Sequence, residues 1–182
     1  MKKVSIIYFL ILLIGLFFSC KKIGKLKEFD LSYSQDITIP SGNTFFAVPF
    51  DIKTPETTTN TKADYKNEGT SSKLVERVTL TELILHIKSP QSGNFDFLNS
   101  IEVYLSSPNN AEVLVASKNN IPETGLTSLS LDVNSTDLKN YLQDDSFSLR
   151  VKTTTDRTIT YDVIIQADET VRVKARLRNI FK

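Results

Sequence analysis

The sequence has almost none of the residues that form covalent cross-links or transfer protons. Its 182 residues include one cysteine, one histidine and no tryptophan. A single cysteine excludes an internal disulfide, so stability must come from apolar burial, and one domain of this length can bury roughly 68–70% of its unfolded surface. The lone histidine, His86, has the parity of the polar positions in its segment. Because acid–base catalysis needs a group that titrates near neutral pH, we predict a non-enzymatic protein.

Neither sign of charge is in excess. The formal net charge is +1 at pH 7, whereas nucleic-acid-binding domains usually carry a strongly basic surface. The acidic pairs Asp144-Asp145 and Asp168-Glu169 lack the closely spaced oxygen ligands of a calcium loop. The sequence therefore predicts no nucleic-acid partner, no metal site and no cofactor.

The one long apolar run lies at the N-terminus. Lys2 and Lys3 precede a nearly continuous apolar stretch over residues 4–18, and Ser19 and Cys20 follow it. The stretch is shorter than the roughly 20 residues that a transmembrane helix needs. A charged start, an apolar centre and a small residue before the cleavage site are typical of a secretory signal peptide.

The run ends in the motif Phe17-Phe18-Ser19-Cys20. This motif resembles the lipobox of bacterial lipoproteins, and the resemblance covers only the first twenty residues. It implies that residues 1–19 are removed, that Cys20 is acylated before and after cleavage, and that the lipid bilayer holds the mature chain. Lys21, rather than an acidic residue, follows the cysteine; in similar lipoproteins this implies the outer membrane, and the lack of an acidic run implies a domain facing the periplasm.

An uncleaved N-terminal anchor is the alternative. The cations that follow the apolar run outnumber those before it, and the positive-inside rule would then disfavour export of the C-terminal side. They are Lys21, Lys22, Lys25 and Lys27. If the segment is cleaved, residues 20–28 instead form a lipidated, basic stem, whose lysines favour an anionic membrane surface.

Beyond residue 28, short segments of alternating apolar and polar side chains are separated by turn signals, and no strand–helix alternation occurs. They are Phe29–Ile39, Phe46–Ile52, Leu74–Lys88, Phe95–Leu105, Val113–Val115, Leu129–Val133, Phe147–Val151 and Ile159–Leu177. We therefore predict an all-β fold: a two-sheet antiparallel β-sandwich, immunoglobulin-like in architecture only, with roughly eight or nine strands in one domain over residues 29–182.

Two segments have features of their own. In Leu74–Lys88 the apolar parity changes near Thr81-Glu82, which predicts a β-bulge. In Ile159–Leu177 the odd positions are apolar almost throughout. That pattern fits one long bent strand or a hairpin with a three-residue loop at 168–170; since the loop has no Gly or Asn for the left-handed position, one strand is preferred.

The remaining parts are a polar segment and a short helix. Residues 54–73 show no apolar period, so we expect a solvated loop that crosses between sheets, although loops of this length are often functional. Leu138, Tyr141 and Leu142 have helical spacing. Two turns of helix need packing to exist, so we expect this helix to close one open end of the β-structure.

The most pointed surface feature is a basic ladder near the C-terminus, formed by Arg172, Lys174, Arg176 and Arg178. Side chains of one parity line one face of a strand about 7 Å apart. Such a ladder could dock an acidic polymer, lipid headgroups or an envelope protein. It could equally be a solvated face paired with acids such as Glu76, or a guard on an edge strand.

These observations favour a membrane-anchored module that binds or scaffolds a component of the cell envelope. A carbohydrate-binding or adhesin-type surface module is the alternative. Its candidate stacking residues are Tyr33, Phe45, Phe46 and Tyr104.

Overall fold

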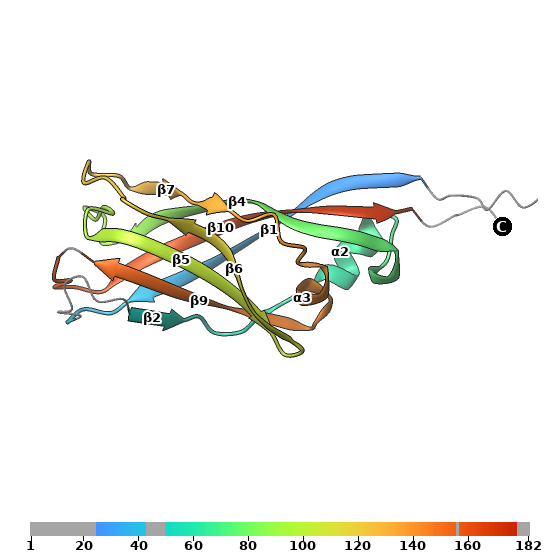
Figure 1. The fold of residues 1–182 in the computed structure, drawn as a ribbon, viewed down its shortest axis with the longest axis horizontal. Helices are drawn as coiled ribbons and strands as arrows, with labels where there is room; N and C mark the ends of the chain where they lie inside the picture. Colours follow the sequence, from blue (N-terminus) through green and yellow to red (C-terminus); the bar gives the residue numbers. More distant parts are fainter. Residues whose placement is uncertain (1–24, 43–49, 156, 178–182) are drawn as a thin grey trace, which may run out of the picture.

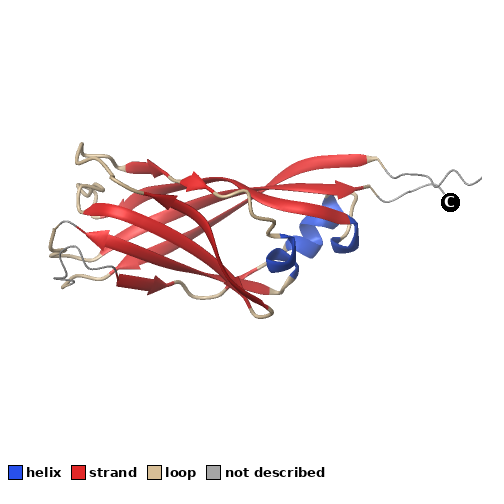
Figure 2. Cartoon of the chain, viewed as in Figure 1, coloured by secondary structure: helices blue, strands red, loops and turns tan. Residues whose placement is uncertain are grey.

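Two antiparallel sheets face each other in the computed structural model, which describes residues 25–42, 50–155 and 157–177 (Figures 1 and 2). The first sheet has the order β1 (Leu26–Ile39), β10 (Val163–Arg176), β4 (Val75–Ser89), β7 (Ser128–Ser130). The second has the order β2 (Phe50–Lys53), β9 (Ser146–Thr155), β5 (Leu98–Ser107), β6 (Asn110–Lys118), β8 (Asp132–Val133), and β3 (Thr57–Thr58) also pairs with β9. The helices are α2 (Thr61–Asn67) and α3 (Lys139–Gln143), with a 3-10 turn at Ser72–Leu74.

The connectivity is that of a jelly roll. Antiparallel partners are nested along the chain: β1 pairs with β10, β2 with β9, β4 with β7, and β5 with β6. Nesting of this kind rolls a long hairpin into two facing sheets, as in double-sheet jelly rolls. The all-β two-sheet antiparallel sandwich expected from the sequence is confirmed, and its strand order differs from that of immunoglobulin domains.

Residues Ile159–Leu177 contain one uninterrupted strand, as preferred from the sequence. β10 pairs with β1 on one side and β4 on the other, straight through Asp168 and Glu169. The predicted bulge is also present, because Thr170 pairs with Glu82 while the next residue pairs with Leu80, leaving Thr81 as the extra residue. The bulge lets both halves of β4 keep their apolar side chains on the buried face.

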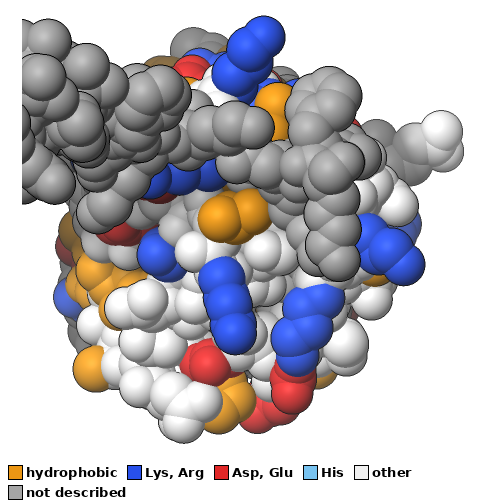
Figure 3. Space-filling view, turned by 90° about the vertical axis from the view of Figure 1, so that its right-hand side faces the viewer, with side chains coloured by type: hydrophobic (Ala, Val, Ile, Leu, Met, Phe, Trp, Pro, Cys, Tyr) orange, Lys and Arg blue, Asp and Glu red, His pale blue; other side chains and the backbone are white. Residues whose placement is uncertain are grey.

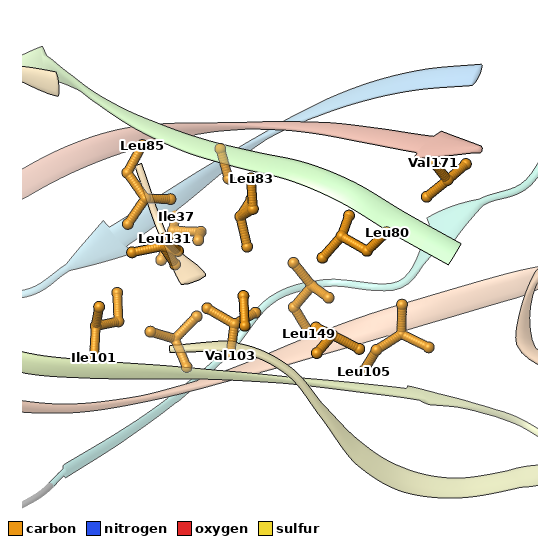
Figure 4. Packing of buried hydrophobic residues seen from close by; sticks show 14 of the residues in the cluster. Ile37, Leu80, Leu83, Leu85, Ile101, Val103, Leu105, Leu131, Leu149 and Val171 are labelled. Atoms are coloured by element: carbon orange, nitrogen blue, oxygen red, sulfur yellow. The ribbon is translucent and has the colours of Figure 1, made fainter. Parts of the chain in front are cut away.

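The core lies between the sheets. Leu83 and Leu85 of β4 face Ile101 and Val103 of β5, and Leu131 lies between the two layers (Figure 4). All five side chains are buried. Alternation therefore assigned these side chains to the correct face before any pairing was known.

Residues 129–133 do not form the single strand expected from their alternation. β7 joins the first sheet and β8 joins the edge of the second, so the chain crosses between layers at Leu131. The Leu131 amide donates to the carbonyl of Leu83 at 3.0 Å. This division, together with β3, gives ten strands among the described residues, against the expected eight or nine.

The helices occupy one end of the sandwich (Figure 2). α3 follows Leu138, and Leu138 and Leu142 are buried, as expected for a helix that closes the β-structure. The expectation of an irregular loop over 54–73 is wrong. The segment does cross between sheets, but it carries β3 and α2, with Tyr65 fully buried and Thr61 Oγ1 donating to the Leu142 carbonyl at 2.7 Å. Because only a few side chains of this segment are buried, its sequence shows no apolar period.

The described chain begins and ends together, at what we call the terminal end of the sandwich (Figure 1). Leu26 pairs with Arg176, and the Leu177 amide donates to the Lys25 carbonyl at 3.0 Å. Residues 26–28, which sequence analysis assigned to the stem, therefore belong to β1. The connections β4–β5, β6–β7 and β9–β10 lie at the opposite end, which we call the loop end (Figure 1).

Candidate functional site

The predicted lipidation residue, Cys20, and the last member of the basic ladder, Arg178, lie outside the described residues. Within the described part of the chain, no three His, Cys, Asp or Glu side chains are grouped so that they could hold a metal ion. No helix there is long and apolar enough to cross a bilayer. His86 is half-exposed, with Nε2 3.6 Å from an oxygen of Asp168.

The described members of the basic ladder lie on the outer face of the first sheet. Arg172 donates to both oxygens of Asp30, at 3.0 and 3.1 Å, and Arg176 donates to Glu76 at 2.7 Å. The hydrogen bond from Arg172 lowers the pKa of Asp30 below its ordinary value. Because β10 is a central strand, the ladder guards no sheet edge, and these ion pairs favour a solvated, paired face over an anion-binding one.

The aromatic candidates for sugar stacking that the structure describes, Tyr33 and Tyr104, already contact other side chains. The Arg150 guanidinium covers the ring of Tyr104 at 4.2 Å from its centroid. Tyr33 points into the sandwich and meets Phe147 edge to face, with 5.9 Å between ring centroids. Phe45 and Phe46 lie outside the described residues.

A buried carboxyl lies between the sheets, at Glu169, which the sequence marked only as half of an acidic pair. Glu169 is 7% exposed, and its Oε1 accepts a hydrogen bond from Gln35 at 2.7 Å. Its second oxygen and the hydroxyl of Tyr33 have no hydrogen-bond partner among the described residues, and both side chains line an apolar cavity of about 20 Å³. Burial raises the pKa of Glu169 to about 7. Its odd number on a strand whose odd residues face inward was the signal that could have identified it.

The loop end carries a more open pocket of about 130 Å³. One wall comes from the β4–β5 connection and the other from the β9–β10 connection. Its lining residues are Asn94, Asp96, Phe97, Arg157, Thr158, Ile159, Thr160, Tyr161 and Val163. The sequence does not reveal this pocket, because Tyr161 shares the parity of the apolar positions of the last strand, whereas β10 begins only at Val163.

Tyr161 is 53% exposed, and among the described residues only Leu26 is a comparably exposed large apolar side chain. The loop that carries Tyr161 is held at both sides. The Ile159 carbonyl accepts a hydrogen bond from Gly42 at 2.9 Å, and the Asp162 carboxylate accepts one from the Ser41 amide at 2.7 Å. The pocket wall is therefore supported by hydrogen bonds to the turn that follows β1.

Comparisons with known proteins give only distant structural similarities. No protein family and no curated protein matches the chain. Among solved structures it is similar to the decameric BFDV capsid protein, with a TM-score of 0.40, 6% identity, and coverage of 84% of this chain and 100% of that one. Turnip yellow mosaic virus has a TM-score of 0.34 and 12% identity, with coverage of 87% of this chain and 98% of that one. A carbohydrate-binding module of the β-sandwich superfamily has a TM-score of 0.26 and 10% identity, with coverage of 88% of this chain and 59% of that one. With TM-scores below 0.5, these likenesses carry no argument about function.

Proposed function

We propose that this protein is a lipid-anchored, non-enzymatic binding module of the bacterial cell envelope. Acyl chains on Cys20 hold it in the outer membrane, the domain faces the periplasm, and the loop end of the sandwich contacts its ligand or partner. The supporting sequence feature is the lipobox-like motif ending in the chain's only cysteine.

The observation that carries this proposal is that two exposed apolar side chains lie at opposite ends of the sandwich. Leu26 lies at the terminal end, next to the segment that leads back to Cys20, and Tyr161 lies at the loop end. The length of the sandwich separates these ends (Figure 1). A domain tethered at the terminal end would therefore hold the pocket beside Tyr161 away from the membrane.

The charge at the terminal end supports the same orientation. Lys25, Lys66 and Lys73 are exposed, and their side chains form no ion pair with any described residue. Several Lys and Arg side chains stand around this end in the end-on view of Figure 3. Each cation close to an anionic leaflet contributes about 1 kcal/mol to membrane association.

Replacement of the cysteine tests the anchor. We expect Cys20→Ser to abolish palmitate labelling and to move the protein out of the membrane fraction, because the chain has no other cysteine. Ser19→Ala keeps a small residue before the cleavage site and is the matched control, with labelling unchanged. If Cys20→Ser leaves labelling and fractionation as they were, the lipid-anchor proposal is wrong.

Site-specific photo-crosslinking in intact cells tests the binding role. A crosslinking residue at position 161 should give an envelope adduct, whereas one at position 104, on the outer face of the second sheet, should not. Equal adducts at both positions, or none at 161, would contradict a binding site at the loop end. Protease treatment of intact cells checks the periplasmic orientation, since a domain facing the periplasm is protected.

A further inference from the structure

The loop-end pocket combines an exposed aromatic ring with unpaired hydrogen-bonding groups. Tyr161 stands at its rim, 53% exposed. The hydroxyls of Thr158 and Thr160 form no hydrogen bond with any described residue, and both side chains are exposed. A pocket that orients a small ligand typically pairs apolar surface with a few convergent polar groups.

The opposite wall carries a hydrogen-bond acceptor, the Asp96 carboxylate, whose orientation is fixed by a hydrogen bond. One oxygen of Asp96 accepts a hydrogen bond from the Gly125 amide at 2.7 Å, and the Asp96 amide donates to the Asn94 side chain at 3.1 Å. The second carboxylate oxygen of Asp96 has no hydrogen bond with any described residue. Because the contact with Gly125 orients the carboxylate before a ligand arrives, less conformational freedom is lost on binding.

The charges of the pocket select against anions. Arg157, its one cation among the described lining residues, is ion-paired with Glu123. Asp96 adds a negative charge on the other wall. A ligand with carboxylates, sulfates or phosphates would meet this carboxylate without a free cation to compensate it, and like charges at close range are costly.

A neutral sugar ring fits each of these features. Its C–H face is apolar and can lie on an aromatic ring, while its hydroxyls both donate and accept hydrogen bonds, as carboxylate, amide and threonine side chains require. From the exposed Tyr161 ring, the oriented Asp96 and the neutralised Arg157, we infer that the loop-end pocket binds a neutral saccharide, with one ring stacked on Tyr161. This inference rests on the proposed binding role of the loop end and names its ligand class.

The test uses the full-length protein in a detergent without a sugar headgroup. Screening on an array of neutral and anionic oligosaccharides should give retention on neutral glycans, and calorimetry with the best of them gives the affinity. We expect Tyr161→Ala to weaken binding at least tenfold and Asp96→Ala to weaken it several-fold. Tyr161→Phe keeps the stacking surface and should stay within threefold of the parent protein.

Tyr104→Ala is the matched control, because it removes a surface tyrosine whose ring is already covered, and it should leave saccharide affinity unchanged. Thermal unfolding of each variant verifies that the fold is kept. Retention of anionic glycans alone, no retention of any glycan, or binding insensitive to Tyr161→Ala overturns the saccharide inference. If a protein still crosslinks at position 161 in such a case, the binding-module proposal survives; if nothing does, both fall.

Discussion

Replacement of Glu169 by Gln should change how stability depends on pH. Glu169 lies on the inner face of β10, where burial raises the pKa of its carboxyl from the ordinary 4.5 to about 7. Glu169→Gln has nearly the same shape and keeps an oxygen that can accept the hydrogen bond from Gln35. The substitution thus removes the ionisation while preserving the packing.

The sign follows from the two protonation states. Below pH 4.5 the carboxyl is neutral in both the folded and the unfolded protein, so its favourable contribution is fully present. Between pH 4.5 and 7 the unfolded chain loses the proton while the folded protein retains it, so the free energy of unfolding falls as pH rises. At about 1.4 kcal/mol per pKa unit, the loss approaches about 3 kcal/mol and levels off above pH 7.

Urea unfolding of the parent protein and of Glu169→Gln at a series of pH values between 4 and 8 measures this difference. The variant should gain about 3 kcal/mol relative to the parent between pH 4.5 and 7. Asp168→Asn is the control from the opposite face of β10. Hydrogen bonds from Ser34 and Gln166 lower the pKa of Asp168, so its contribution is present at neutral pH and is lost as pH falls. Parallel curves for the parent and Glu169→Gln would refute the reasoning.

Three further predictions concern the core and the two charged surfaces. Leu142→Ala, in the helix that closes the sandwich, should lower the free energy of unfolding by about 2–5 kcal/mol in urea titration, because it leaves a cavity in a buried cluster; a change under 1 kcal/mol would contradict this packing. The double variant Lys66→Glu, Lys73→Glu should weaken flotation with anionic vesicles by at least tenfold at low salt and leave neutral vesicles unaffected. The double variant Arg172→Ala, Arg176→Ala should cost no more than about 1 kcal/mol per ion pair and leave crosslinked partners unchanged; loss of a partner would restore the basic ladder as a binding surface.

Local sequence patterns predicted several elements well because they depend on nearest neighbours. Alternation placed Val171 and Val173 inside and Arg172 outside, and the structure agrees. The change of parity near Thr81 marked a bulge, since a strand cannot otherwise keep one face buried. The helical spacing of Leu138 and Leu142 marked α3. Each of these inferences needs only the geometry of one strand or one helix.

The functional candidates were harder to predict because they depend on distant segments. Tyr161 shares its parity with buried residues, and only the start of β10 at Val163 shows that it lies in a loop. Its partner across the pocket, Asp96, comes from a connection between two other strands. The alternation of apolar and polar side chains along one strand carries no information about which loops meet at one end of a sandwich.

The sequence by itself determined the alternation that makes this an all-β sandwich, and it carries the motif around Cys20 that suggests a lipid anchor. Both are local: a period of two residues defines the two faces of a strand, and a short motif is read by processing enzymes without a fold. Only the tertiary structure decided the jelly-roll order, the crossing at Leu131, the ion pairs of Arg172 and Arg176 within the basic ladder, and the pocket beside Tyr161. These depend on pairings between segments far apart in the chain, such as β1 with β10, and such pairings follow from how the whole core packs.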